Sequence, residues 1–118
     1  MLKLNIPKEP YWLNVGYGVK IKVKPCTSNI FYQAKAYMND KISQTVKQYK
    51  EAKEVGADVS DFLDLNNPKI REAFADEHLT IGMALAGILE WEGILEAESD
   101  EPAPVCEQKI EELFSNFW

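Results

Sequence analysis

The longest apolar run in the chain, LTIGMALAGIL at residues 79–89, is apolar on nearly every side of a helix. This pattern is typical of a helix that other elements cover on more than one side. Asn67 is suited to cap its start, and Pro68 fits the first helical position, where no N–H is needed. Gly93 can adopt the left-handed conformation that ends a helix. We therefore expect a core helix that begins near Asn67 and continues through Trp91 to Gly93.

Three residues inside this predicted helix carry a further expectation. Gly82 and Gly87 each cost roughly 1 kcal/mol relative to alanine in a helix, which is best explained if another helix or hairpin backbone packs closely there. His78 falls on the apolar stripe of the helix. We expect it to be a partly buried, hydrogen-bonded residue, which a lone histidine in such a place more often is than a ligand or a base.

An N-terminal β-hairpin is indicated by a second pattern. Residues 19–24 (VKIKVK) alternate apolar and lysine side chains, which predicts a strand with one covered and one exposed face. Gly16 and Gly18 supply turn conformations that other residues avoid, so residues 11–15 and 18–24 are expected to pair. Because a lone two-stranded ribbon is marginally stable in water, it must pack on helices or recruit strands from another chain.

Two more amphipathic helices complete the prediction. Apolar residues recur at spacings of three and four from residue 28 to about 55, and again from 107 to 117. The acidic, proline-bearing stretch 96–104 between helices predicts a mobile surface loop. The expected fold class is α+β, a small N-terminal β-hairpin packed on a bundle of about three helices. We expect one domain over residues 1–118, with a hairpin region at 1–25 and a helical region at 26–118.

Length and composition agree with a globular protein. A chain of 118 residues is long enough to bury a core, and 46% hydrophobic with 27% charged residues is ordinary for a soluble domain. No Lys- or Arg-led apolar segment opens the chain, so no signal peptide is expected and the cytoplasm is the predicted compartment. Cys26 and Cys106 lie 80 residues apart without a CxxC motif, which favours free thiols.

Charge is distributed unevenly along the chain. Residues 1–53 carry ten lysines and three acidic residues, a net +7, whereas residues 54–118 carry sixteen acidic and three basic residues, a net −13. This asymmetry suits steering toward a charged partner, or head-to-tail association of copies. Alternatively, the two halves are solvated separately or compensate one another within the fold.

Lysines on the predicted second strand form a candidate basic edge, made of Lys20, Lys22 and Lys24. Together with Tyr11 and Trp12 they interleave charge with aromatic rings, as single-stranded nucleic-acid binders do. Edge strands also carry lysine to prevent unwanted pairing, and the acidic total disfavours a polyanion binder. Nucleic-acid binding is therefore a secondary hypothesis.

Catalytic motifs are missing from the sequence. Cys26 and His78 are the only pair that could form a thiol dyad, and no neighbouring residue in the sequence activates either. Phosphate-binding glycine loops, HExxH and GxSxG do not occur. Asp58, Asp61 and Asp64 are three apart but lack the spacing and the glycine of a calcium loop. We predict a non-enzymatic binding or assembly protein without a cofactor or metal ion.

Aromatic residues mark the candidate protein-binding surfaces. Chain ends seldom carry exposed Phe or Trp without a surface to dock on. The candidates are the hairpin residues Tyr11 and Trp12, the corner Trp91, Glu92 and Gly93, and the C-terminal aromatics Phe114, Phe117 and Trp118. Local packing is the alternative for each of them, and Trp91 is expected chiefly to close the top of the core.

Short motifs along most of the chain suggest a family. An apolar helix ends in Trp91-Glu92-Gly93, an acidic loop covers 96–101, and Pro104-Val105 opens a helix. Toward the N-terminus, the strand 18–23 and Lys24-Pro25 precede a long helix. In these features the chain resembles the tail assembly chaperones of tailed phages and prophages. Cys106 departs from the pattern, because Thr or Ser is expected there as a cap.

The resemblance implies an α+β protein without catalytic activity. It would act in the cytoplasm of a bacterial host cell by binding the tape-measure or tail-tube protein during tail assembly. A structural virion protein of the tail or head-tail joint, forming a ring by head-to-tail self-association, is the first alternative, and a small nucleic-acid-binding regulator is the second. No membrane association is expected, because the apolar run has about half the 20 residues that a spanning helix needs.

Overall fold

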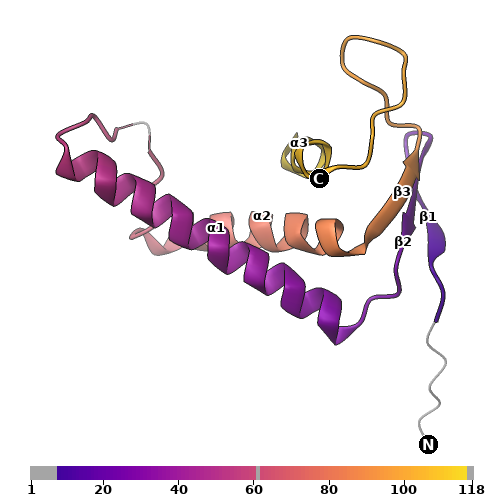
Figure 1. The fold of residues 1–118 in the computed structure, drawn as a ribbon, viewed down its shortest axis with the longest axis horizontal. Coiled ribbons are helices and arrows are strands. Elements are labelled where there is room, and N and C mark those ends of the chain that lie inside the picture. The colour runs from indigo at the N-terminus through magenta and orange to yellow at the C-terminus, as the bar shows by residue number, and fades with distance from the viewer. Residues whose placement is uncertain (1–7, 61, 117–118) are drawn as a thin grey trace, which may run out of the picture.

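The computed structural model describes residues 8–60 and 62–116, and it confirms the α+β class with an N-terminal hairpin and three helices (Figure 1). The elements in chain order are β1 (Tyr11–Gly16), β2 (Val19–Val23), α1 (Ser28–Glu54), α2 (Pro68–Gly87), β3 (Ile88–Glu92) and α3 (Glu107–Asn116). The predicted cap of the core helix is confirmed, because the Asn67 side chain accepts the Lys69 N–H at 3.0 Å and Pro68 opens α2.

The three strands form one antiparallel sheet in the order β1-β2-β3. The predicted hairpin is confirmed, with Tyr11 opposite Val23 and Leu13 opposite Ile21. Its turn depends on backbone that favours glycine, since Gly16 and Gly18 have φ angles of 90° and 74°. Side chains in register lie on the same face of a sheet, so β1 and β2 present a continuous apolar face.

The third strand corrects the prediction of a core helix that continues through Trp91. Helix α2 ends at Gly87, and Ile88–Glu92 pairs with β2 on the side away from β1. Apolar periodicity cannot separate helix from strand at such a boundary, because both read as an unbroken apolar run. Pairing with β2 decides the outcome, and Gly93 (φ 85°) consequently follows a strand where a helix end was expected.

Helices α1 and α2 approach most closely at Gly82. A β-carbon placed there would lie 2.9 Å from both Cα and the carbonyl oxygen of Ala34, which is fully buried. The predicted close contact at Gly82 is therefore confirmed. At Gly87 the hairpin backbone also comes close, but on the carbonyl side, because a β-carbon placed there would meet no other part of the protein within 4 Å. The Gly87 carbonyl instead accepts the Lys24 N–H at 2.8 Å, which joins the end of α2 to the end of β2.

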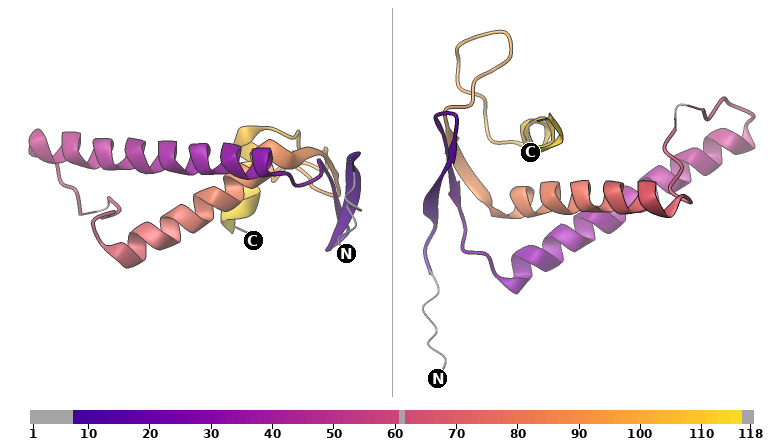
Figure 2. Two further views of the ribbon diagram at one scale, coloured as in Figure 1. Left: turned by 90° about the horizontal axis from the view of Figure 1, so that it is seen from below. Right: turned by 180° about the vertical axis from the view of Figure 1, so that it is seen from behind.

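The molecule is flat and open. Its extents are 54 × 49 × 19 Å and its radius of gyration is 17.6 Å, whereas a compact domain of this length has about 13–14 Å. Helix α1 is continuous over 27 residues, and the separation between α1 and α2 increases with distance from the sheet (Figure 2). The core cluster is correspondingly small, with Ile81, Ala84 and Ile110 at its centre.

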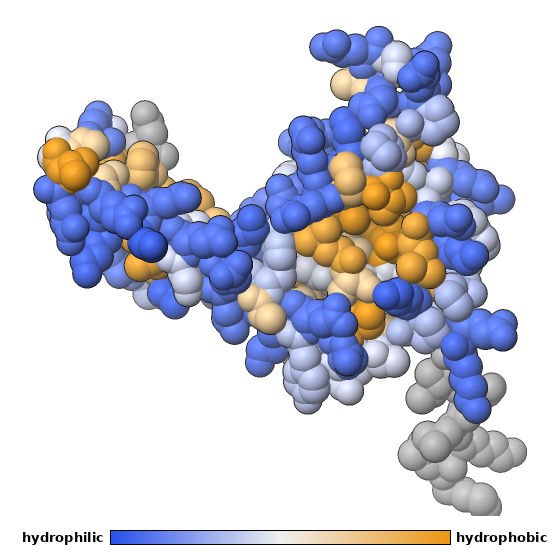
Figure 3. Space-filling model, in the orientation of Figure 1, coloured by the Kyte–Doolittle hydropathy of each residue, from blue (hydrophilic) through white to orange (hydrophobic). Residues whose placement is uncertain are grey.

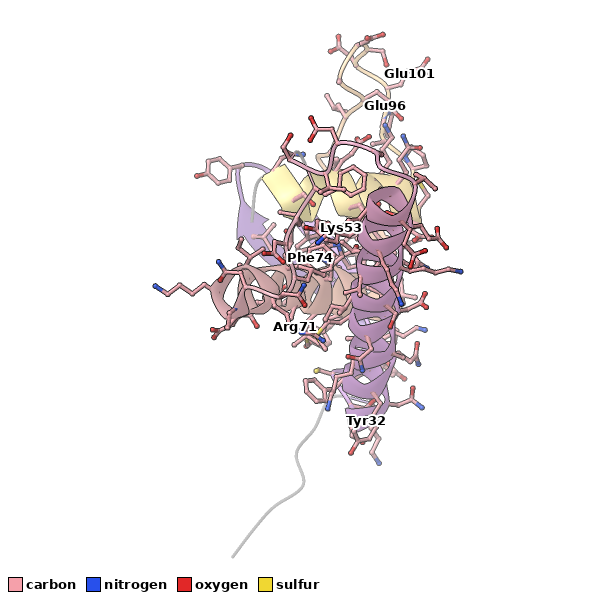
Figure 4. The ribbon with its side chains drawn as sticks, turned by 90° about the vertical axis from the view of Figure 1, so that its left-hand side faces the viewer. Tyr32, Lys53, Arg71, Phe74, Glu96 and Glu101 are labelled. Carbon is pink, nitrogen blue, oxygen red and sulfur yellow. The ribbon has the colours of Figure 1, made fainter. Side chains whose placement is uncertain are left out.

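Helix α3 and the acidic loop are attached to this core by polar side chains. The Tyr37 hydroxyl of α1 donates to Glu111 Oε1 of α3 at 2.7 Å, and Lys109 Nζ of α3 lies 2.8 Å from Glu96 Oε2 of the loop. Trp91 packs against the core cluster, as predicted, and its Nε1 donates to the Ala103 carbonyl at 2.7 Å. The loop itself projects from the body, and the Glu96 N–H donates to the Glu101 carbonyl at 2.9 Å across it (Figure 4).

Replacing Gly82 with alanine should destabilise the protein by about 1–3 kcal/mol, although alanine is the better helix former, because the new methyl group meets the rigid backbone of Ala34. Gly87→Ala is the matched control and should be neutral or slightly stabilising, because its surroundings are open. Urea unfolding of both variants measures the difference. A Gly82→Ala protein as stable as the wild type would contradict the close helix contact.

Tyr37 should make the fold sensitive to alkali. Burial first, and then the hydrogen bond to and charge of Glu111, raise the pKa of Tyr37 above its ordinary value of 10.0. A raised pKa means that the protonated Tyr37 stabilises the folded state. The contribution is complete below the unfolded-state pKa and is lost as pH rises above it, because only the unfolded chain then releases the proton. Tyr37→Phe should lower stability at neutral pH by about 1–2 kcal/mol. The same substitution should also reduce the fall in the free energy of unfolding between about pH 9 and pH 11.

Tyr32→Phe is the control for this measurement, since Tyr32 is 65% exposed near the start of the same helix (Figure 4). Urea unfolding across the pH range should give the same profile for Tyr32→Phe as for the wild type. If Tyr37→Phe also followed the wild-type profile, the Tyr37–Glu111 contact would not hold α3 in solution.

Candidate protein-binding site

An apolar groove of about 490 Å³ lies between the sheet, α2 and α3. Figure 3 shows apolar side chains gathered on the surface between these elements. The sheet contributes one wall, α2 the floor, and α3 the far rim. The principal lining residues are Tyr11, Leu13, Val15, Ile21 and Val23 of the sheet, Met83, Ala84 and Gly87 of α2, and Phe114 of α3.

Strand register explains the apolar wall. Tyr11 and Leu13 of β1 lie opposite Val23 and Ile21 of β2, so all four share the face that looks into the groove. Trp12 alternates to the opposite face. The sequence pattern of β2 therefore predicted a covered face correctly, but the helices cover that face only in part.

The groove stays open because its floor is made of small residues. Ala84 and Gly87 of α2 cannot reach across to the sheet, and Met83 is the one large α2 side chain in the lining. As a result Tyr11 is 37% and Leu13 is 42% exposed. Contiguous apolar side chains left open to water on this scale are typical of surfaces that bind other molecules.

Charged residues lie at the two ends of the groove. Lys24 lines the end where α2 meets the sheet. A second hollow, which shares Thr80 and Phe114 with the groove, is lined by Asp76 and Glu77. Within residues 8–60 and 62–116, the salt bridges found do not involve Lys24, Asp76 or Glu77. The groove is therefore apolar along its length, with a positive and a negative end.

The structure separates the two residues of the conceivable thiol dyad. Cys26 is exposed and lines the groove, whereas His78 Nδ1 donates to the Phe74 carbonyl at 2.9 Å. The His78 ring also stacks on Phe74 with centroids 4.0 Å apart, which confirms its expected structural role. No hydrogen bond between Cys26 and His78 occurs among the described residues. The same part of the chain holds no group of three or more His, Cys, Asp or Glu side chains placed to bind a metal ion.

Only some of the predicted binding residues meet in this site. Tyr11 and Phe114 line the groove, and Trp12 is 42% exposed on the other face of the sheet. Trp91 packs inward, and Glu92 lies opposite Lys20.

The remaining predicted residues lie outside the groove. Gly93 is pressed against the backbone of Gly18. Phe117 and Trp118 lie outside the described residues. Leu13, Ile21 and Met83 were missed as binding residues. The alternation of β2 signalled a covered face, but nothing in the sequence showed how incompletely the helices would cover it.

The prediction of a basic edge made of Lys20, Lys22 and Lys24 is wrong, because β2 is not an edge strand. Lys20 and Lys22 lie on β2, the central strand, and they face Glu92 and Glu90 of β3 across the sheet. Lys22 Nζ is 3.7 Å from Glu90 Oε2. Lys24 lies just beyond the strand. Two of the three lysines therefore lie opposite acidic residues from the other half of the chain, which the prediction of a hairpin alone could not anticipate.

The charge asymmetry along the sequence is also reduced by contacts between α1 and α3. Lys41 Nζ of α1 lies 3.9 Å from Glu111 Oε1 of α3. With the pairs between β2 and β3, this contact joins the basic half of the chain to the acidic half. Compensation within the fold, one of the two interpretations left open by the sequence, therefore accounts for part of the contrast.

Among the described residues, no helix combines the length and the apolar character required to cross a bilayer. Comparisons of the chain with models of protein families, with curated proteins and with solved structures found no match.

Proposed function

We propose that this protein is a non-enzymatic assembly factor that holds an apolar helical segment of another protein in the groove. Following the resemblance of its motifs to tail assembly chaperones, the partner would be the tape-measure or tail-tube protein of a tailed phage or prophage. Binding would take place in the cytoplasm of the bacterial host while the tail is built. The open apolar groove is the observation that carries this proposal.

The size and chemistry of the groove support a peptide ligand. Amphipathic helices bind such grooves by inserting apolar side chains spaced three and four residues apart. The small residues Ala84 and Gly87 in the floor leave room for those side chains, and the walls offer them apolar contacts. A polar metabolite would find few hydrogen-bond partners here, because the polar side-chain groups among the described lining residues are limited to Lys24, Thr80, Cys26 and the Tyr11 hydroxyl.

The charges at the ends support one orientation of the bound helix. Glu77 and Gly87 are separated by ten residues of α2, or about 15 Å at the helical rise of 1.5 Å per residue. A bound helix of roughly three turns would span this distance. Its basic end would meet Asp76 and Glu77, and its acidic end would meet Lys24, so the charges select direction more than they add affinity.

The alternatives have less support. A nucleic-acid-binding regulator would need the lysine row to be available, but Lys20 and Lys22 lie opposite glutamates. A ring built by docking the basic end of one copy on the acidic end of the next would need separate charged ends. The pairs between β2 and β3 reduce that separation.

The full-length protein should co-elute with the tape-measure or tail-tube protein encoded beside it, and its two free thiols can report where binding occurs. Cys26 lines the groove and Cys106 does not, although both are exposed. In the complex, maleimide labelling of Cys26 should slow at least about tenfold while Cys106 reacts as before. Failure of both tail proteins to bind would contradict the tail role, and binding with Cys26 still reactive would contradict the groove.

Met83→Glu should weaken partner binding by at least about tenfold, because it places an unpaired charge inside the apolar groove. Val46→Glu adds the same charge at an exposed apolar position on α1, outside the groove, and should bind like the wild type. Titration calorimetry with the identified partner measures both. Equal loss of affinity in the two variants would show that net charge, and not the groove, controls binding.

A further inference from the structure

The outer edge of β1 is open. In the order β1-β2-β3, β1 pairs with β2 on one side only, and no other described strand lies beside it. Figure 1 shows β1 as the outermost strand, on the far side of the sheet from the loop that joins α1 and α2. Every second N–H and C=O of an edge strand points outward, so such an edge can pair with another strand.

The two edges of the sheet differ in their protection. β3 is five residues long, contains Glu90 and Glu92, and has a bulge that breaks its ladder between Ile88 and Glu90. These features discourage further pairing. β1 (YWLNVG) has no charged residue and no proline, and its irregularity is confined to the end near Asn14 and Gly16. The stretch from Tyr11 to Asn14 therefore remains available.

We propose that β1 pairs antiparallel with β1 of a second copy of this chain, joining two three-stranded sheets into one of six strands. This inference rests on the strand edge and is independent of what the groove binds. It concerns the backbone edge of β1, whereas the proposed function uses the apolar face of the same strand.

Charge and closure favour β1–β1 pairing over the other strand pairings that two copies could make. Pairing β3 with β3 would bring Glu90 and Glu92 of both copies together, which is repulsive. Pairing β1 with β3 would leave a free edge at each end and would grow without closure. Pairing β1 with β1 brings no like charges together and closes after two copies. It also covers Trp12 and Leu13, which are each 42% exposed.

Two-fold symmetry requires that the residue at the axis faces its own copy, with the same face of both sheets on the same side. Centring the free stretch Tyr11 to Asn14 on the axis places either Trp12 opposite Trp12 or Leu13 opposite Leu13. In both registers, Tyr11 and Leu13 of the two copies lie side by side on the groove face. The two apolar grooves would then meet at the joined edge and form one longer surface.

The interface involves about five residues from each copy, so the dimer should be weak, with a dissociation constant in about the micromolar range. Sedimentation equilibrium of the full chain should give a concentration-dependent mass between those of one and two copies. A mass that stays at one copy up to about 100 µM, or that grows beyond two copies, would overturn the proposal.

Trp12→Glu tests the edge directly. Inside one chain the new carboxylate lies opposite Lys22, which is favourable, and it is on the face away from the groove. Across the two-fold axis, two such carboxylates repel each other. The dimer dissociation constant should therefore rise at least about tenfold at low salt, and part of this loss should disappear in about 1 M salt. An unchanged constant would overturn the proposal.

Tyr32→Glu is the matched control, because it exchanges an exposed aromatic residue for the same charge on α1, away from the edge. It should dimerise like the wild type. Asn14→Asp is the second test variant, to be used if Trp12→Glu does not fold. The substitution adds charge at the edge while keeping the side-chain oxygen that accepts the Gly16 N–H. Asn14→Asp should raise the dimer dissociation constant at least about threefold. A dimer as tight as the wild type in Asn14→Asp would also overturn the pairing.

Discussion

Strand β2 pairs with a strand on each of its sides, and this pairing positions the helices and the groove. β2 is the central strand, and its second partner is taken from the end of an apolar run that would otherwise continue as helix. The change from helix to strand occurs at Gly87, whose carbonyl accepts the Lys24 N–H at 2.8 Å. This single hydrogen bond ties the last turn of α2 to the end of β2, so the sheet stands at a defined angle to the helices.

The groove is a consequence of that geometry. The helix ends in small residues, Ala84 and Gly87, at the point where the sheet begins, so the apolar face of the sheet has little to pack against. Helix packing is tight elsewhere, at Gly82 and Ala34, where the two backbones touch. The protein therefore combines one well-packed helix pair with one apolar face that is left partly uncovered. An uncovered face of this kind costs stability in the isolated chain and is available to a partner.

Charge acts in two ways in this molecule. Where the basic and acidic halves of the sequence meet, as at Lys22 and Glu90 or Lys41 and Glu111, it holds elements in register and contributes little free energy at the exposed surface. At the ends of the groove, Lys24 and the pair Asp76 and Glu77 have no such compensation among the described residues. Those charges can orient a ligand, which is the more specific use of electrostatics at a binding surface.

The hairpin, the long helix α1, the capped start of α2 and the last helix could all be predicted from the amino-acid sequence, because they depend on local periodicity, turn glycines and caps. That residues 88–92 form a strand follows from long-range pairing, since an apolar run is compatible with helix and strand until a neighbouring strand is in place. The same holds for Lys20 and Lys22, whose glutamate partners are about seventy residues distant in the chain. The groove could not be predicted either, because it results from how little of one sheet face two distant helices cover.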